Sequence, residues 1–173
     1  MTKFVNTIVD FFSTYQSGSA YKELENITTF TLPDMEFEDG ELTGAGIIGT
    51  VNIPDMFNIG ELELSITGKS YSSMKPLFNK SVSLRLNWAE EVAGANGDSS
   101  FDSYTVIAKG RPKKIPGGEI TKGEQKELES TLSCTYYKLI QNGATIFEIN
   151  KLTGVLVING VNLAKELNKA LNK

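Results

Sequence analysis

A glycine pattern at residues 44–49 is the motif in this chain that most directly suggests chemistry. Gly44, Gly46 and Gly49 spell G-x-G-x-x-G, which binds dinucleotides when it joins a strand to a helix, because the helix N-terminus then faces the phosphates. Here residues 50–54 follow as Thr-Val-Asn-Ile-Pro, with three β-branched side chains and a proline that would interrupt a helix. The context therefore argues against a nucleotide site.

The residues before these glycines predict a β-hairpin. Between Met35 and Glu41 apolar and acidic side chains alternate, and the alternation breaks at Asp39-Gly40, a dipeptide that is typical of turns. We therefore expect a long hairpin from Met35 to Ile53, with a flexible tip around Asp39-Gly40 and a glycine-rich end. A hairpin of this length with acidic side chains suits a building block better than a catalyst.

Most residue types that carry enzyme chemistry are missing. The chain contains no histidine, a single cysteine (Cys134) and no G-x-S-x-G sequence, so the commonest general base, the paired-cysteine zinc patterns and the serine-hydrolase elbow are absent. The carboxylate pairs Glu36/Glu38 and Glu61/Glu63 each share one face of a strand. Solvated or channel-facing charge is a better interpretation of them than glycosidase chemistry. We expect no catalytic residues, no metal and no cofactor.

Composition indicates a single globular domain over residues 1–173. Hydrophobic residues make up 40% of the chain and charged residues 22%, and the formal charge of -4 gives no general attraction to nucleic acid or anionic membranes. No stretch approaches the ~18 consecutive apolar residues of a membrane-spanning helix. Cys134 lies in an alternating stretch, which predicts a small buried side chain rather than a reactive thiol.

A basic run at residues 109–114 precedes a polar, glycine-bearing stretch. Its sequence, Lys-Gly-Arg-Pro-Lys-Lys, lacks the interleaved aromatic residues of nucleic-acid-binding surfaces, and acidic residues follow it closely. We interpret the run as a charged interface or a solvated loop, with nucleic-acid binding as the weaker alternative. Residues 111–126 are predicted to form a projecting loop.

Alternating apolar residues predict many short strands. In one of them Leu62, Leu64 and Ile66 are expected to face the core, and Asn142-Gly143 between two apolar runs is a strong hairpin signal. The expected strands cover residues 27–32, 61–67, 81–88, 103–108, 129–141, 144–149 and 155–158.

Two helices are expected. A short helix fits between residues 68 and 79, and a C-terminal helix carries Leu163, Leu167 and Leu171 on one stripe. The segment 4–15 fits either a helical stripe or a strand, and residues 90–98 are expected to form a loop. We therefore predict a mainly antiparallel β-sandwich or barrel with long hairpins, a short middle helix and a C-terminal helix.

Five short motifs occur in an informative order. They are Thr31-Leu32-Pro33-Asp34, the glycine segment 43–49, the basic run 109–114, the strand sequence 133–139 and Asn159-Gly160-Val161-Asn162. In this order, from about Thr28 to the C-terminus, the chain resembles the major tail tube protein family of contractile-tailed, P2-like bacteriophages. Residues 1–27 diverge from the family's pattern, and Thr43 stands where an arginine is common.

The resemblance implies six-membered rings that stack into a tube inside a contractile sheath, with a lumen that conducts the genome. It implies contacts with sheath, tape-measure, baseplate and tail terminator proteins, and DNA that transits the lumen without specific binding. It also implies a place in the virion tail after assembly in the bacterial host cytoplasm, and neither a reaction nor a cofactor. The tube of a phage-derived contractile bacteriocin or another contractile injection system, or a monomeric β-sandwich binding module, remains an alternative.

Two groups of residues become candidates for such an assembly. If Met35 and Phe37 pack on the sandwich, Glu36 and Glu38 face the channel, where an acidic wall repels phosphates. Contacts between subunits or rings are expected from the hairpin and from the basic run, at Asp39, Gly40, Glu41, Gly44, Gly46, Gly49, Arg111, Lys113 and Lys114.

Overall fold

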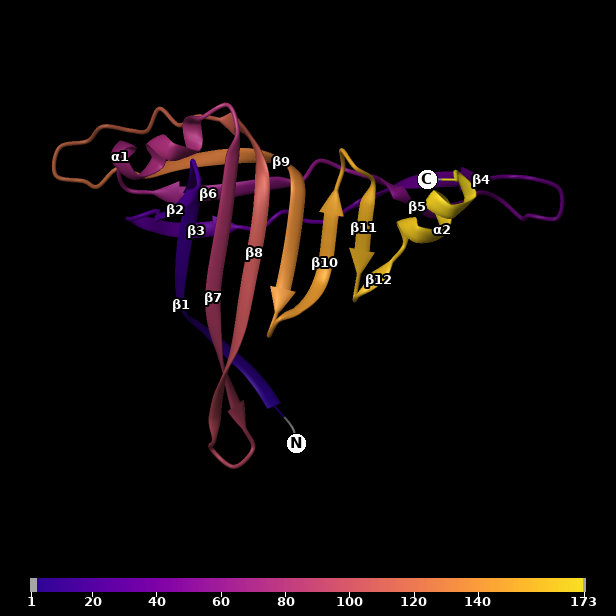
Figure 1. Ribbon diagram of the computed structural model, residues 1–173, viewed down its shortest axis with the longest axis horizontal. Coiled ribbons are helices and arrows are strands. Elements are labelled where there is room, and N and C mark those ends of the chain that lie inside the picture. The colour runs from indigo at the N-terminus through magenta and orange to yellow at the C-terminus, as the bar shows by residue number, and fades with distance from the viewer. Residues whose placement is uncertain (1–2, 173) are drawn as a thin grey trace.

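A computed structural model describes residues 3–172, and the chain is built mainly from antiparallel strands (Figure 1). The mainly β, sandwich-like class predicted from the sequence is confirmed. The elements in chain order are β1 (Lys3–Ser17), β2 (Ala20–Glu23), β3 (Ile27–Thr31), β4 (Phe37–Leu42), β5 (Val51–Ile59), β6 (Glu63–Gly68), α1 (Tyr71–Met74), η1 (Lys75–Phe78), β7 (Val82–Gly94), β8 (Ser99–Lys114), β9 (Leu128–Gln141), β10 (Ala144–Asn150), β11 (Val155–Ile158), β12 (Val161–Asn162) and α2 (Ala164–Ala170).

One long sheet forms the first layer. Its strands follow the order β12-β11-β10-β9-β8-β7-β1-β2, and neighbouring strands are antiparallel. The predicted turn between β9 and β10 is confirmed, with Asn142 and Gly143 at φ values of 48° and 82°. Both residues have the left-handed backbone that a tight two-residue hairpin turn requires.

The second layer is smaller and shares β9 with the first. β3 pairs with β6, and β6 pairs with residues 128–133 of β9, whereas residues 136–141 of β9 pair with β10. The core fills the space between the layers. Leu62, Leu64 and Ile66 are at most 1% exposed, as their alternation predicted.

The N-terminal segment is a strand. β1 pairs with β7 along most of its length, and the pairing register shifts twice, between Val5 and Thr7 and between Ile8 and Asp10. Each shift adds a residue to β1 and interrupts the alternation of its side chains. This is why the apolar residues of β1 have a spacing that also fits a helix.

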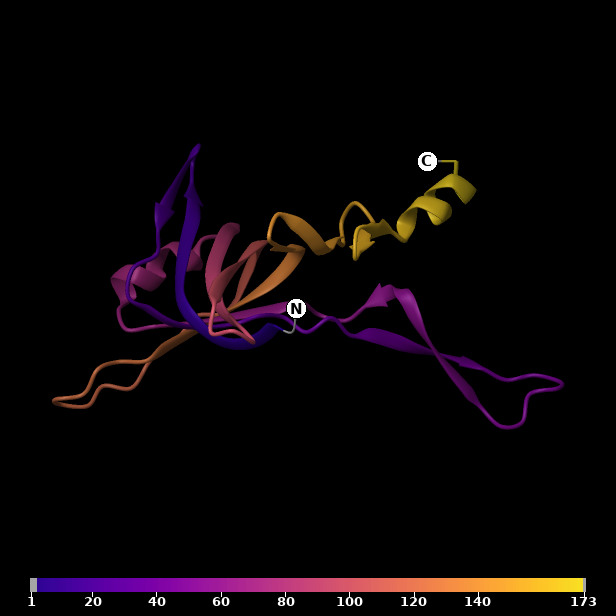
Figure 2. The same cartoon turned by 90° about the horizontal axis from the view of Figure 1, so that it is seen from below.

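The β7–β8 hairpin is longer than predicted at both ends. The expected loop at 90–98 is wrong over its first half, because β7 continues to Gly94 and the turn comprises only residues 95–98. At the other end, residues 111–114 belong to β8, so the connection to β9 spans residues 115–127. Figure 2 shows this connection extending away from the sheets.

Both expected helices are present and short. Ser70 caps α1 by accepting a hydrogen bond from the Ser72 N–H at 3.2 Å, and Pro76 lies in the first turn of η1, where its missing N–H costs nothing. At the C-terminus the Asn162 Oδ1 accepts a hydrogen bond from the Ala164 N–H at 3.0 Å. Among residues 3–172, no helix is long and apolar enough to cross a membrane.

Cys134 is buried in the core, as predicted. Burial raises the pKa of its thiol to about 11 because the thiolate would lose its hydration. The thiol therefore stays protonated near neutral pH and acts as a small apolar side chain.

Candidate assembly interface

The two layers leave one long ribbon projecting from the body. β3 and β4 form one side of this ribbon and β6 and β5 the other, with pairs that run from Thr31 opposite Ser65 through Phe37 opposite Ile59 to Leu42 opposite Val51. The β3–β6 part lies on the core, whereas β4 and β5 extend beyond it (Figure 2). Within the described residues, β4 and β5 form a sheet of only two strands, so both outer edges lack a partner.

The outer part of this hairpin, residues 39–54, has one apolar and one polar face. Leu42 lies opposite Val51 and Gly40 opposite Ile53, so these side chains share a face. Leu42, Val51 and Ile53 remain 49%, 41% and 54% exposed. The opposite face carries Asp39, Glu41, Asn52 and Pro54. A hairpin with an exposed apolar face and two unpaired edges is suited to docking on another protein.

The predicted hairpin is confirmed, but its tip is not at Asp39-Gly40. Both residues lie inside β4, paired with Pro54 and Ile53. The connection is the glycine segment, where Gly46 and Gly49 have φ values of 88° and 83°. These glycines turn the chain without a helix, so the G-x-G-x-x-G pattern lacks the geometry of a nucleotide site.

The structure places Glu36 and Glu38 on the exposed surface near the base of the hairpin, while Met35 packs against the core. The Glu38 Oε2 accepts a hydrogen bond from Asn58 Nδ2 at 2.8 Å, beside the register shift between Phe37 and Asp39. The two strands cross between base and tip (Figure 2), as expected of a strongly twisted two-stranded ribbon.

Two of the three basic candidates are neutralised within the chain. Lys113 Nζ lies 2.7 Å from the Glu61 carboxylate and also contacts Glu63, and Lys114 Nζ lies 3.7 Å from Glu129. The hydrogen bond from Lys113 lowers the pKa of Glu61, and the same contact raises the pKa of Lys113. These groups are solvent-exposed, so the pairs fix the end of β8 more than they stabilise the fold.

Arg111 is the basic candidate that remains available. Its side chain is exposed, and it forms no ion pair within the part of the chain that the structure describes. The structure does not bring Arg111 or Lys113 near the glycine segment of the same chain. Arg111 pairs with Ser133, which pairs with Glu63 at the start of β6, whereas the glycine segment closes the far end of the β4–β5 hairpin. Any contact between these two candidate groups must therefore join separate copies.

Acidic residues are concentrated in the ribbon, a feature that was not among the predictions from sequence motifs. Residues 23–68 contain ten Asp and Glu and no Lys or Arg, although the whole chain has 17 basic residues. Eight of these ten lie within residues 27–68, the sequence from β3 to β6, whereas Glu23 ends β2 and Glu25 precedes β3. A running count of charge along the sequence detects this separation of acidic from basic residues.

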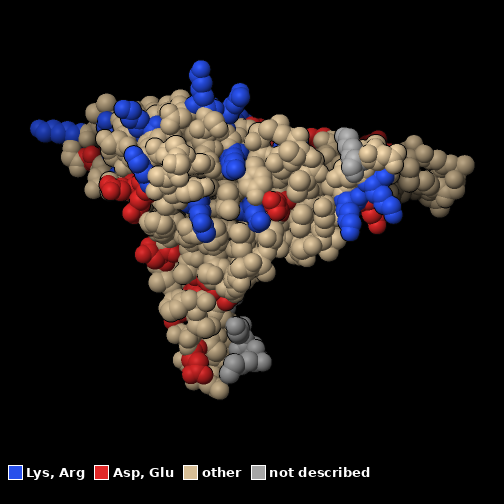
Figure 3. Space-filling model, viewed as in Figure 1, with Lys and Arg blue, Asp and Glu red and all other residues tan. Residues whose placement is uncertain are grey.

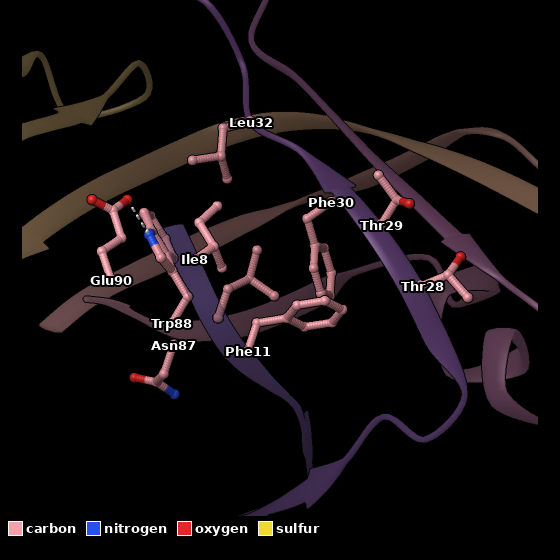
Figure 4. A pocket seen from close by; sticks show the side chains of 10 residues that line it. Ile8, Phe11, Thr28, Thr29, Phe30, Leu32, Asn87, Trp88 and Glu90 are labelled. Atoms are coloured by element: carbon pink, nitrogen blue, oxygen red, sulfur yellow. Dashed lines mark hydrogen bonds between the residues drawn. The ribbon is translucent and has the colours of Figure 1, made fainter. Parts of the chain in front are cut away.

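An apolar hollow of about 320 Å³ lies between the layers at the N-terminal side of the sandwich. Ile8 and Phe11 from β1, Phe30 from β3 and Trp88 from β7 line it (Figure 4). Phe11 and Phe30 meet edge to face with centroids 5.4 Å apart, and Trp88 Nε1 donates to the Glu90 carboxylate at 3.0 Å. The lining offers an apolar surface and no constellation of nucleophile and base.

No group of three or more His, Cys, Asp or Glu side chains within the described residues is arranged to hold a metal ion. The carboxylates instead spread along exposed strands, in the ribbon and at the closed end of the β7–β8 hairpin. The features that call for a partner are therefore surfaces: an amphipathic hairpin, unpaired strand edges and segregated charge.

Two known proteins are similar to parts of this chain. The tail tube protein of Escherichia phage P2 is 36% identical over 56 residues, which cover 32% of this chain and 33% of that protein. The match therefore spans about a third of that relative's length. A chain in the structure described as the anti-feeding prophage baseplate, 6-fold symmetrised, has a TM-score of 0.42 and 10% identity, covering 75% of this chain and 91% of its own.

A family model described as phage tail tube protein FII matches residues 7–171, nearly the whole chain. The motif order that suggested a P2-like tail tube protein is thereby confirmed, and the chain belongs to the family of phage tail tube proteins FII.

Proposed function

We propose that six copies of this chain form a ring and that rings stack into the inner tube of a contractile phage tail, through which DNA passes. The observation that carries the proposal is the outer hairpin, residues 39–54, which projects from the body with an exposed apolar face and two free edges. The isolated chain leaves this surface unburied, and a second copy supplies the missing cover.

The ring follows from how the hairpin completes a neighbour's sheet. The outer hairpin of one copy lies beside the β3–β6 ribbon of the next, so each copy contributes four strands to a common barrel. Six copies give roughly 24 strands, and at ~4.8 Å per strand and a tilt near ~40° the backbone circle is about 48 Å across. A channel of that width accommodates a DNA duplex after side chains are added.

Imaging tests the ring directly. Concentrated protein viewed by negative-stain electron microscopy is expected to show rings with sixfold symmetry and hollow tubes made from them. The partner-free chain would otherwise expose the apolar face of its hairpin to water. Protein that stays monomeric at high concentration, by light scattering and on the grid, contradicts the proposal and favours a monomeric binding module.

The acidic ribbon is proposed to line the channel, with Glu36 and Glu38 facing it. Both side chains are exposed, on the segment whose neighbour Met35 packs into the core. Phosphates that pass an acidic wall are repelled and do not bind, so DNA slides freely. The same logic extends to Asp39 and Glu41 on the polar face of the outer hairpin.

Phage carrying Glu36→Lys together with Glu38→Lys are expected to build normal tubes but to eject DNA several-fold more slowly. The lysines would bind the phosphates that the carboxylates repel. Ejection is followed by the release of fluorescently stained DNA from single particles. The matched control is Glu119→Lys with Glu124→Lys in the connection 115–127, which changes net charge equally away from the ribbon. Equal ejection rates in wild type and the ribbon variant contradict the lumen assignment.

A further inference from the structure

The closed end of the β7–β8 hairpin is acidic. Residues 86–108 contain Glu90, Glu91, Asp98 and Asp102 and no Lys or Arg. Among the side chains that the structure describes, none of these four forms an ion pair. Figure 3 shows acidic residues on the arm that extends below the body in that view. The arm also exposes an aromatic side chain, Phe101, which is 63% accessible.

The open end of the same hairpin is basic. Lys80 precedes the first residue of β7, Arg111 follows the pairing of Val82 with Gly110, and Lys75 belongs to the adjoining η1. All three basic side chains are exposed and, in the described region, lack an ion pair. In Figure 3 basic residues gather over this upper end. We call the two ends of the hairpin the acidic pole (Glu90, Glu91, Asp98, Asp102) and the basic pole (Lys75, Lys80, Arg111).

The poles cannot neutralise each other within one molecule. Glu90 and Asp102, the acidic-pole residues nearest the basic pole, each lie eight residues from the Val82–Gly110 pair, or roughly 26 Å at ~3.3 Å per residue. That distance is several times the screening length of about 8 Å at physiological ionic strength. Each pole therefore presents net charge to its surroundings.

We propose that the acidic pole of one copy docks on the basic pole of another copy in the adjacent ring, and that this contact fixes the head-to-tail orientation in which rings stack. The inference rests on the proposed tube. Two different patches at opposite ends of one molecule form a heterologous contact, which repeats without closing and so builds a filament. The ribbon contact closes the ring, whereas the pole contact propagates along the axis. Opposite charges also reject a ring that arrives upside down, because like poles then meet.

Charge reversal tests the contact in both directions. Glu91→Lys with Asp98→Lys inverts much of the acidic pole and spares Glu90 and Asp102, whose carboxylates accept hydrogen bonds from Trp88 and Asn142. Lys80→Glu with Arg111→Glu inverts the basic pole. Each double variant is expected to raise the critical concentration for tube growth, measured by sedimentation, about tenfold or more while rings persist. The combined fourfold variant is expected to return to within about threefold of wild type.

The control is Lys165→Glu with Lys169→Glu on α2, which matches the charge change of the basic-pole variant away from both poles. This control should polymerise like wild type. Ionic strength gives a second measurement that needs no variant, since added salt should raise the critical concentration of the wild type. If rings form but tube growth ignores both charge reversal and salt, the pole contact is wrong while the ring stands. If wild-type protein forms no rings at all, the proposed tube itself fails.

Discussion

Shortening the projecting hairpin is expected to give a folded protein that cannot form rings. In this variant an Asn-Gly turn replaces residues 41–52 and joins Gly40 to Ile53, which already face each other across the hairpin. None of residues 41–52 belongs to the core or packs against it, so their removal leaves the core intact. Light scattering should report a monomer at concentrations where the wild type assembles, with a circular dichroism spectrum that remains rich in β structure.

A pair of point variants separates the two faces of this hairpin. Ile53→Asp puts a charge on the apolar face, and Asn52→Asp puts the same charge on the polar face one residue away. If the apolar face docks on a neighbour, each buried side chain contributes about 1 kcal/mol and a carboxylate in its place is costly to bury. Ile53→Asp should therefore abolish rings, and Asn52→Asp should retain them. Rings in the shortened variant, or equal effects of the two substitutions, would rule out docking through this face.

The sequence predicted those parts of the fold in which burial alternates. In β6 the residues Leu62, Leu64 and Ile66 repeat every second position because one face of the strand lies on the core. Cys134 and the turn at Asn142-Gly143 were equally accessible to prediction, since a buried strand and a tight turn each restrict which residues fit. Local patterns are informative wherever the chain's own core imposes them.

The wrong predictions concern exposed segments and segments near a register shift. Asp39-Gly40 has the composition of a turn, yet the left-handed glycines Gly46 and Gly49 set the reversal further along. The end of β7 carries Glu90 and Glu91, so its composition resembled a loop although its backbone remains paired with β8. The chain's own core does not impose a burial pattern on an exposed strand edge or hairpin, so the alternation that predicts a strand is missing there.

The candidate interface residues were also only partly predictable from the sequence. Hairpin, glycine segment and basic run were identified from motifs, whereas the ion pairs of Lys113 with Glu61 and Glu63 required the fold, because β8 and β6 are distant in sequence. The charge segregation of residues 23–68 was present in the sequence throughout. Only the structure shows that the strands formed by this stretch pair along one continuous ribbon, so that the acidic side chains lie on the same part of the molecule.

Gly110→Ala is expected to be the most destabilising single methyl group added to this chain. Gly110 is buried at a register shift between β8 and β9, with β7 on its other side. A Cβ atom there would overlap the Ser133 carbonyl oxygen and lie 2.9 Å from the Cα of Cys134. Both are backbone atoms, so relief requires moving β8 away from β9. We expect a loss of about 2–3 kcal/mol in the free energy of unfolding, measured by urea titration below the concentration at which tubes form.

Gly117→Ala is the matched control for this substitution. Gly117 lies in the exposed connection between β8 and β9, a Cβ there meets no atom within 4 Å, and its backbone is not left-handed. The same added methyl group should therefore change stability by no more than about 0.5 kcal/mol. Because β8 joins the basic pole to the core, a shift at Gly110 should also displace Arg111, so Gly110→Ala should impair tube growth beyond what its lower stability explains. Equal urea midpoints for the two variants would show that β8 and β9 do not approach each other closely at Gly110. The expected loss of stability and the expected defect in tube growth would then both be wrong.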